Sequence, residues 1–320
     1  MKFSVVAIAA FLSFTAAQPC AAEDAYPSRP IKLIVPFAAG GNTDVVGRLT
    51  AAYMQKALNT SVVVENRAGA GGINGTDVVA KSPPDGYTLM IASDPLVVNP
   101  VIYSSLTFDP ARDFAPIITV ATLSQVLAVN PKLPAANFAE FVALARSRPN
   151  TINVGTSGVG SPGHLTIALL VQAGVPLVHV PYRGAGPAVV DAVGGQIDAT
   201  IVTLPATIGM IRQSQLRALA VTSSRRSRFA PEVVSMSELL SSVVVDSWQA
   251  FFAPAGTPPD VIQRLNASVA GLLRSREVTD AFETQAFEAG GGSPDDLGKF
   301  LRDETTRWTP IIKAAGIRAE

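Results

Sequence analysis

The sequence predicts an α/β protein with two domains, each organised around parallel strands. Short apolar runs alternate with helical patterns along the chain, which is typical of a sheet flanked by helices. A chain of 320 residues exceeds what one hydrophobic core usually organises, which favours two domains. The order strand, glycine-rich loop, helix start occurs twice, over residues 31–44 and 151–165. We therefore expect one such unit in each domain.

The amino terminus has the pattern of a secretory signal. Lys2 precedes an apolar run from Phe3 to Ala17 that is too short to span a bilayer, and small residues ending at Ala22 offer a cleavage site. We expect residues 1–22 to be removed together with the single cysteine, Cys20. The mature, exported chain would then have no disulfide, thiol nucleophile or thiolate metal ligand.

The composition of the remaining chain argues against nucleic-acid and membrane partners. Without Lys2, 24 of the 25 basic residues remain beside 25 acidic ones, for a net charge of about −1. Such a chain has no basic field for nucleic acid or an anionic membrane. The apolar share of 48% comes in short runs, none of which approaches the ~20 apolar residues of a membrane helix. We expect no nucleic-acid partner and no membrane insertion after signal removal.

The first unit starts with Ile31–Val35, which reads as a strand buried on both faces. The loop after it ends at Gly40-Gly41, and a helical pattern begins near Asn42. A helix start leaves unpaired N–H groups at the positive end of the helix dipole. This loop is therefore a candidate anion site, and a carboxylate fits it as well as a phosphate does. An ordinary β–α turn is the alternative.

The rest of the first domain continues the alternation of strand and helix. We expect a strand over 61–64, a helix over 76–81 and a strand over 87–92. Two short strands over 117–120 and 126–129 then follow, and we place the first crossing between the domains in the segment that separates them.

Asp94 follows the strand over 87–92, so it would lie at the same sheet edge as the Gly40-Gly41 loop. Its carboxylate could accept a hydrogen bond from an ammonium, amide or hydroxyl group of a ligand. A turn residue before Pro95 is the alternative interpretation.

The second unit has a strand over 151–154, a glycine loop over 155–161 and a helix from Pro162 capped by Ser161. It predicts a second helix start directed at an anion. Further strands are expected over 177–180, 199–203, 216–221 and 248–253, the last returning to the first domain, and apolar stripes predict a helical carboxyl-terminal region.

The sequence gives little support for a bound cofactor or metal ion. Residues 158–163 fit the pattern G-x-G-x-x-G, but the next strand ends at His179-Val180-Pro181-Tyr182, without the acidic residue of a dinucleotide site. His164 and His179 are the only histidines, which excludes a three-histidine zinc site. We expect neither a cofactor nor a metal.

Catalysis by a serine hydrolase stays open as a rival hypothesis. Such an enzyme would use Ser157 or Ser161 with His164. The G-x-S-x-G elbow of many hydrolases is incomplete, because Val159 stands where its second glycine belongs.

The chain resembles the Bug family of periplasmic solute-binding proteins, the receptors of tripartite tricarboxylate transporters, over nearly all of its mature length. The motifs that carry the resemblance occur in the family's order. They are YPSRPIKLIVPF (Tyr26–Phe37) followed by GGNTD, VVVENRAGAGG (Val62–Gly72), PDGYTL (Pro84–Leu89), NVGTSGVGSPGHL (Asn153–Leu165), HVPYRGAGPAVVDAVGGQID (His179–Asp198), LRALAVTSSRRS (Leu216–Ser227) and APAGTP (Ala253–Pro258).

The resemblance implies a type II periplasmic-binding-protein fold, in which two α/β lobes enclose a ligand cleft. We assign residues 23–123 and 249–320 to lobe 1 and residues 124–248 to lobe 2, with a return crossing near 222 as the alternative. The implied protein is a monomeric, non-catalytic periplasmic receptor. It captures a small organic carboxylate and delivers it to membrane permease subunits. A ligand sensor for a membrane kinase is the alternative role.

The resemblance also implies that the two glycine loops grip the carboxylate. Three departures from the family pattern bear on the ligand: Ala38-Ala39 replaces a Pro-Gly-Gly approach, Asp94 replaces a small or polar residue, and Val202-Thr203 replaces an Asp-Asn pair. The expected ligand-binding residues are Phe37, Ala38, Ala39, Gly40, Gly41, Asp44, Ser93, Asp94, Thr156, Ser157, Gly158, Ser161, His164, Tyr182 and Thr203.

Overall fold

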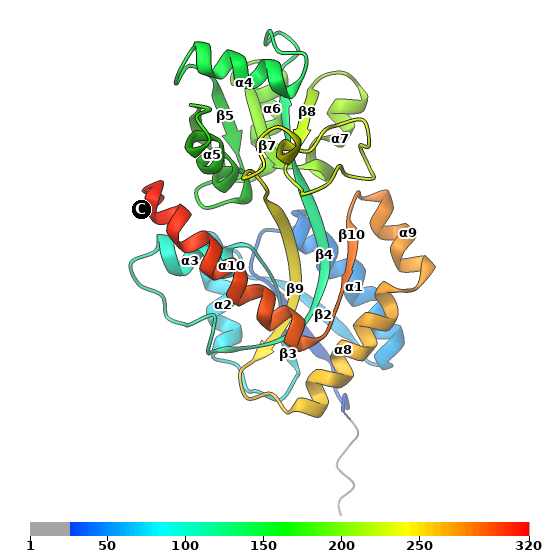
Figure 1. Ribbon diagram of the computed structural model, residues 1–320. Helices are drawn as coiled ribbons and strands as arrows, with labels where there is room; N and C mark the ends of the chain where they lie inside the picture. Colours follow the sequence, from blue (N-terminus) through cyan, green and yellow to red (C-terminus); the bar gives the residue numbers. More distant parts are fainter. Residues whose placement is uncertain (1–25, 320) are drawn as a thin grey trace, which may run out of the picture.

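The computed structural model describes residues 26–319, which form two α/β lobes joined by two long strands (Figure 1). The expected signal over residues 1–22 lies outside the described residues. The two joining strands are β4 (Phe114–Val129) and β9 (Asp246–Pro254).

Lobe 1 is built from both ends of the described chain. Its first part contains β1 (Ile31–Val35), α1 (Asn42–Leu58), β2 (Val62–Asn66), η1 (Ala70–Gly72), α2 (Ile73–Ala80), β3 (Thr88–Ser93) and α3 (Pro95–Ile102). Its second part contains α8 (Pro259–Leu273), α9 (Arg276–Thr284), β10 (Glu288–Gly291) and α10 (Pro294–Ala314).

Lobe 2 is a continuous stretch of chain between the joining strands. Its elements are α4 (Phe138–Ser147), β5 (Asn153–Thr156), α5 (Pro162–Gln172), β6 (Val178–Pro181), α6 (Ala185–Gly194), β7 (Ala199–Thr203), α7 (Leu204–Arg212), β8 (Arg217–Val221) and η2 (Met236–Glu238).

The strands form one mixed sheet in the order β2-β1-β3-β9-β4-β7-β5-β6, with β8 and β10 also paired to β4. The expected parallel strands are present in each lobe, where β1 pairs with β2 and β3, and β5 pairs with β6 and β7. The joining strands differ from the expectation, because β4 and β9 run antiparallel to their neighbours. Each lobe therefore brings the carboxyl ends of its parallel strands to one edge.

The prediction of two short strands over 117–120 and 126–129 was wrong, because β4 runs unbroken for 16 residues. Its backbone pairs with β9 as far as Ser124 and with β7 from Gln125 onward. Polar side chains at Thr122, Ser124 and Gln125 imitate a break, but they mark the place where the pairing of β4 changes from β9 to β7. We propose that the lobes divide between Ser124 and Gln125 and again at the start of β9.

The segment between β8 and β9 belongs with lobe 2 by its packing. Ala230 and Val233 pack in one apolar cluster with Val126, Leu204 and Val221. This packing favours a return crossing at β9 over the alternative near residue 222.

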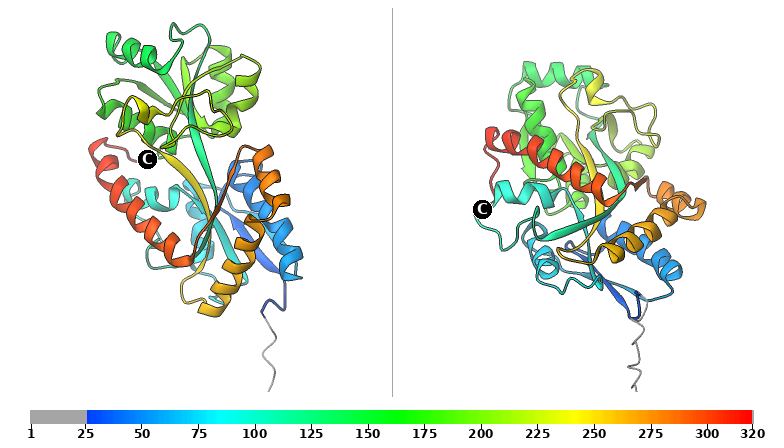
Figure 2. Two further views of the ribbon diagram at one scale, coloured as in Figure 1. Left: turned by 45° about the vertical axis from the view of Figure 1, so that its right-hand side comes forward. Right: turned by 60° about the horizontal axis from the view of Figure 1, so that its bottom comes forward.

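Helices cover both faces of the lobe 1 sheet (Figure 2). Apolar side chains of α1, α8 and α9 pack in one core on the first face, and those of α2, α3 and α10 pack in another on the second face. The second core continues into α4 and α5 of lobe 2. The lobes therefore share apolar packing on the side of α10.

Helix α3 and strand β10 were absent from the sequence expectation. Helix α3 starts with Pro95 at its first turn, a favourable place for proline, and also contains Pro100. Strand β10 has the sequence EAGG, and a Cβ on Gly290 would lie 2.4 Å from the carbonyl oxygen of Thr119. A glycine is therefore required for β10 to approach β4.

Candidate functional site

The first glycine loop joins β1 to the start of α1. Gly40 has φ +82, in the region that favours glycine, and Gly41 is the extended residue before the helix. No side chain caps this helix start. The loop is exposed from Ala38 to Gly41, so its surface is open to a solute.

Asp44 fixes this loop through hydrogen bonds of its carboxylate. The side chain is 3% exposed, and its carboxylate accepts hydrogen bonds from the N–H of Gly40 at 2.9 Å, Nε of Arg48 at 2.9 Å and Nδ2 of Asn66 at 2.9 Å. Burial alone would raise the pKa of Asp44, but these hydrogen bonds outweigh it and keep that pKa below its usual value. Asp44 is thus an internal anion at the helix start, where the dipole favours it.

Asn66, at the end of β2, completes this support. Its Nδ2 also donates to the carbonyl oxygen of Phe37 at 3.0 Å, and its Oδ1 accepts from Nη2 of Arg48 at 2.7 Å. Sequence reasoning missed Arg48 and Asn66. Their positions gave a weak signal, since Arg48 lies four residues after Asp44 on the helix and Asn66 ends the strand beside β1.

The second glycine loop joins β5 to α5. The Thr156 hydroxyl lies 2.7 Å from Nε2 of His179 and accepts from the N–H of Gly158 at 3.2 Å. The Ser161 hydroxyl caps α5 by accepting from the N–H of His164 at 3.3 Å. These bonds fix the loop from inside lobe 2.

The two histidines stack beneath this loop, with ring centroids 3.7 Å apart. Nδ1 of His164 accepts from the N–H of Gly160 at 3.2 Å, so in the neutral ring Nε2 carries the proton. Burial lowers the pKa of His164 to about 3, with a contribution from His179, and lowers the pKa of His179 to about 4. Both rings are neutral near pH 7 and act as supports of the loop. Sequence reasoning missed the role of His179.

Contacts between the lobes place both loops at the lobe junction. Nδ2 of Asn42, in the first turn of α1, donates to Oγ1 of Thr203 at the end of β7, at 2.8 Å. In the second loop, a Cβ on Gly160 would lie 2.8 Å from Cδ1 of Ile102 and 3.1 Å from Cγ1 of Val98, both in α3 of lobe 1. Each loop therefore lies against the opposite lobe.

The remaining expected residues lie in more enclosed positions. Ser93 is buried at the end of β3, and Asp94 is 6% exposed. The Asp94 carboxylate accepts from the hydroxyl of Ser247 in β9 at 2.6 Å, and burial raises the pKa of Asp94 to about 7. The half-buried Tyr182 donates its hydroxyl to Asp191 at 2.7 Å. A ligand contact at these residues stays a prediction.

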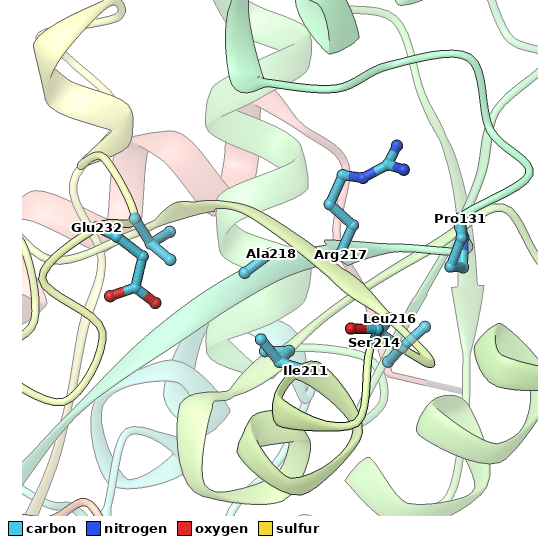
Figure 3. Close-up of a pocket in the computed structure, with 8 residues that line it drawn as sticks. Pro131, Ile211, Ser214, Leu216, Arg217, Ala218 and Glu232 are labelled. Carbon is cyan, nitrogen blue, oxygen red and sulfur yellow. The ribbon is translucent and has the colours of Figure 1, made fainter.

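Two cavities lie away from the glycine loops, and neither contains an expected ligand residue. One, of about 360 Å³, lies in lobe 2 beside β8 (Figure 3). Another, of about 450 Å³, lies beside the joining strands at the turn over 223–228. Within residues 26–319, no group of three or more His, Cys, Asp or Glu is placed to hold a metal ion. None of the helices in that range has the length and apolar character needed to cross a bilayer.

Comparison with known proteins identifies the family of this chain. The model of the family described as "Tripartite tricarboxylate transporter family receptor" matches residues 46–317. The chain belongs to this receptor family. Members of it are solute-binding receptors, and the Bug proteins are among the receptor's relatives.

The receptor is 40% identical to protein BugT of Bordetella pertussis over 299 residues, covering 92% of each chain. Among solved structures, it matches R. palustris Rpa4515 with adipate at 35% identity and a TM-score of 0.84, covering 92% of this chain and 99% of the other. It matches the periplasmic binding protein BugD at 31% identity and a TM-score of 0.81, covering 92% and 100%. It also matches MatC of Rhodopseudomonas palustris with bound malate at 29% identity and a TM-score of 0.78, covering 90% and 100%. These matches confirm the type II periplasmic-binding-protein fold.

Proposed function

We propose that this receptor captures a small organic carboxylate between its lobes in the periplasm and delivers it to membrane permease subunits. The observation that carries the proposal is the position of the two glycine loops, each at a helix start and each against the opposite lobe. Backbone N–H groups and helix dipoles stabilise an anion at such places. Related structures with adipate and with malate support the same class of ligand.

The loops are suited to reversible capture because they are held in place before a ligand arrives. Asp44 and Asn66 fix the first loop, while Thr156 and His164 fix the second. A preorganised site loses little conformational entropy when it binds. We infer that the receptor releases its ligand unchanged, since the Ser161 hydroxyl already caps α5 and Nδ1 of His164 is occupied by Gly160.

A thermal-shift screen of aliphatic dicarboxylates, hydroxy acids, aromatic acids and amino acids tests the proposal on ligand-stripped protein. We expect a saturable rise in melting temperature with a subset of carboxylates, and no product after prolonged incubation. No shift with any carboxylate would contradict the proposal. Release of a product would favour the serine hydrolase instead.

The second proposed feature is a ligand donor group, amino or amide, that contacts Asp94. Because one oxygen of Asp94 accepts from Ser247, such a donor would use the other oxygen. We expect Asp94→Ala to weaken binding of amino- or amide-bearing acids more than binding of plain carboxylates, as measured by calorimetry. Equal affinity of variant and wild type for every such ligand would refute this feature. Capture for a membrane kinase is the alternative role, and binding assays with purified permease subunits would discriminate the two.

A further inference from the structure

The cavity beside the joining strands has walls from both lobes and lies away from the glycine loops. Its volume is about 450 Å³, which is within the range of roughly 300–1,000 Å³ that is typical of small-molecule sites. Lobe 2 contributes the turn over residues 223–228, and lobe 1 contributes Glu288 of β10 and Phe300 of α10. A molecule that fills this cavity therefore contacts both lobes.

The floor of the cavity is one face of β9, β4 and β10, which lie side by side (Figure 1). Thr122 of β4 pairs with Trp248 of β9 and with Glu288 of β10, and Ser124 of β4 pairs with Asp246 of β9. Paired residues, and residues two apart along a strand, point to the same face of a sheet. The carboxylates of Asp246 and Glu288 therefore share this face, on the two outer strands.

Aromatic side chains supply the apolar part of the cavity. Phe300 is half-buried and packs edge-on against Trp248, with ring centroids 5.7 Å apart. Trp248 is 1% exposed, and its Nε1 has no hydrogen-bond partner among residues 26–319. A buried donor without a partner is costly and calls for an explanation. A group from outside the chain can approach this indole from the cavity that Trp248 lines.

Two of the three arginines at the cavity are already neutralised. Arg226 donates from Nε and Nη2 to Glu238, each at 2.8 Å, and Arg228 donates from Nη1 to Glu283 at 2.6 Å. Neither glutamate lines the cavity. The third arginine, Arg225, is exposed. The turn therefore contributes about one positive charge that is free to interact.

The two carboxylates of the floor are less well neutralised. Within residues 26–319, neither Asp246 nor Glu288 forms a salt bridge. Loss of solvation, with contributions from the carboxylates of Glu304 and Glu288, raises the pKa of Asp246 to about 6, although Arg307 opposes the rise. Near pH 7 these two negative charges exceed the one free positive charge of Arg225 by about one.

We propose that this cavity is a second ligand site, separate from the one proposed for the carboxylate, and that it takes a small organic monocation such as a primary amine. The ammonium group lies at the floor, where Asp246 and Glu288 attract it, and the hydrocarbon part packs against Phe300. An ammonium group donates hydrogen bonds and accepts none, so it pairs with these carboxylates and not with the guanidinium groups of the turn.

Calorimetry with two probes of equal length tests this site on ligand-stripped protein: pentylamine, which is cationic, and 1-pentanol, which is neutral. We expect pentylamine to bind at least about tenfold more tightly, as a charge-assisted hydrogen bond would produce. Asp246→Asn and Glu288→Gln should each weaken pentylamine binding by about 3- to 20-fold and leave 1-pentanol binding unchanged. Their melting temperatures without a probe should not fall, because the replaced carboxylates repel each other.

Asp280→Asn is the matched control, since this exposed carboxylate of α9 pairs with Arg276 and lies outside the cavity. It should keep the affinity for pentylamine. Adipate in excess, at constant ionic strength, should not displace the amine, because the proposed carboxylate site lies elsewhere.

Three results would overturn the inference. They are failure of wild type to bind pentylamine more tightly than 1-pentanol, an unchanged affinity for pentylamine in both floor variants, and displacement of pentylamine by adipate. The last result would place the amine in the carboxylate site. None of them bears on the capture of a carboxylate, which the thermal-shift screen tests separately.

Discussion

Asp44 is the residue on which the shape of the first glycine loop depends. Its carboxylate joins the loop to α1 and, through Asn66, to β2. A residue expected to contact the ligand thus acts on the site through the backbone of Gly40. This arrangement keeps one negative charge permanently near a helix start that is proposed to receive another.

Asp44→Asn should destabilise the protein by about 1–3 kcal/mol at pH 7, because it weakens charge-assisted hydrogen bonds. The folded-state pKa of Asp44 lies below its unfolded value. The contribution of Asp44 to stability is therefore present above the pKa that Asp44 has in the unfolded chain. It is lost as pH falls through the pKa that Asp44 has in the folded protein. Urea denaturation should show a difference from wild type that shrinks below about pH 4. Asp303→Asn, which breaks an exposed pair with Lys299 on α10, should cost less than about 1 kcal/mol; an equal cost would contradict the prediction.

Asp94 should give the opposite pH dependence. Its folded-state pKa is raised to about 7 by burial, so the folded protein retains a proton that the unfolded chain has released. The contribution of Asp94 to stability should therefore fall as pH rises from about 4 to 7, by up to about 4 kcal/mol. Asp94→Asn should remove this fall. Parallel stability curves for the two proteins between pH 4 and pH 8 would count against it.

The histidine pair adds a third pH signature. Folded-state pKa values of about 3 for His164 and about 4 for His179 lie below the unfolded value. The contribution of the two histidines to stability should be full above about pH 6.5 and decline as pH falls toward those values, since the unfolded chain binds the protons first. His179→Gln should flatten this decline in denaturation curves from pH 7 to pH 4, with His164 retained as the internal reference. An unchanged slope would indicate that the ring is hydrated in the folded state.

At the scale of elements, the start of α5 shows how closely the second loop is packed. A Cβ on Gly163 would lie 2.1 Å from the carbonyl oxygen of Ile201, so α5 approaches β7 more closely than any other residue allows. This approach sets where the loop over residues 157–161 lies relative to the junction.

Gly163→Ala should therefore push α5 away from β7 and cost at least about 2 kcal/mol of stability. Ligand affinity should fall as well, because the loop moves with the helix. Gly271→Ala in α8 is the control, since its new methyl group would meet no atom within 4 Å. That control should raise stability by about 0.5–1 kcal/mol. Chemical denaturation and calorimetry on both variants measure these effects, and a neutral Gly163→Ala would contradict the packing argument.

Much of the fold was predictable because local signals and tertiary structure agree. Strand β1 and the start of α1 at Asn42 follow from an apolar run and a glycine loop. Strand β4 was not predictable as one continuous strand. The polar residues near Ser124 locally indicate a break, but the strand continues because it pairs with β9 and β7, which are distant in the sequence. Strand β10 has too little side chain to be detected.

The candidate site was predictable in its loops and less so in its supports. The glycine loops were predictable because only a few backbone conformations require glycine, so its presence indicates a loop. The bond from Asn66 to Asp44, and the stacking of His164 on His179, join residues from different elements. Such pairs depend on strand order, which periodicity does not reveal.

At the scale of the whole molecule, the lobes are linked at several separate places. Asn42 contacts Thr203 near the glycine loops, while Arg228 of lobe 2 pairs with Glu283 of α9 at 2.6 Å. Helix α10 shares its apolar core with both lobes. The proposed capture of a ligand between the lobes must therefore preserve or rearrange these contacts.

Asn42→Ala should weaken ligand binding by up to about tenfold, because the lost hydrogen bond favours the arrangement in which the lobes touch. Thr203→Val should have the same effect, and the double variant should add little, as a double-mutant cycle by calorimetry can establish. Arg228→Ala breaks an exposed ion pair and should change affinity by about threefold or less. Fully additive effects of the two site variants would show that Asn42 and Thr203 act independently.

The insertion of β9 between β3 and β4 also dictates an order of assembly. A polypeptide that emerges amino end first, from a ribosome or a translocation channel, exposes lobe 2 as an uninterrupted stretch before residue 246 appears. Until then β3 and β4 have vacant edges facing each other, and such edges invite pairing with other chains. Lobe 2 should thus fold early, while lobe 1 stays incomplete until its last strands and helices are available. Chaperones that bind incomplete lobe 1 would protect it from aggregation during this interval.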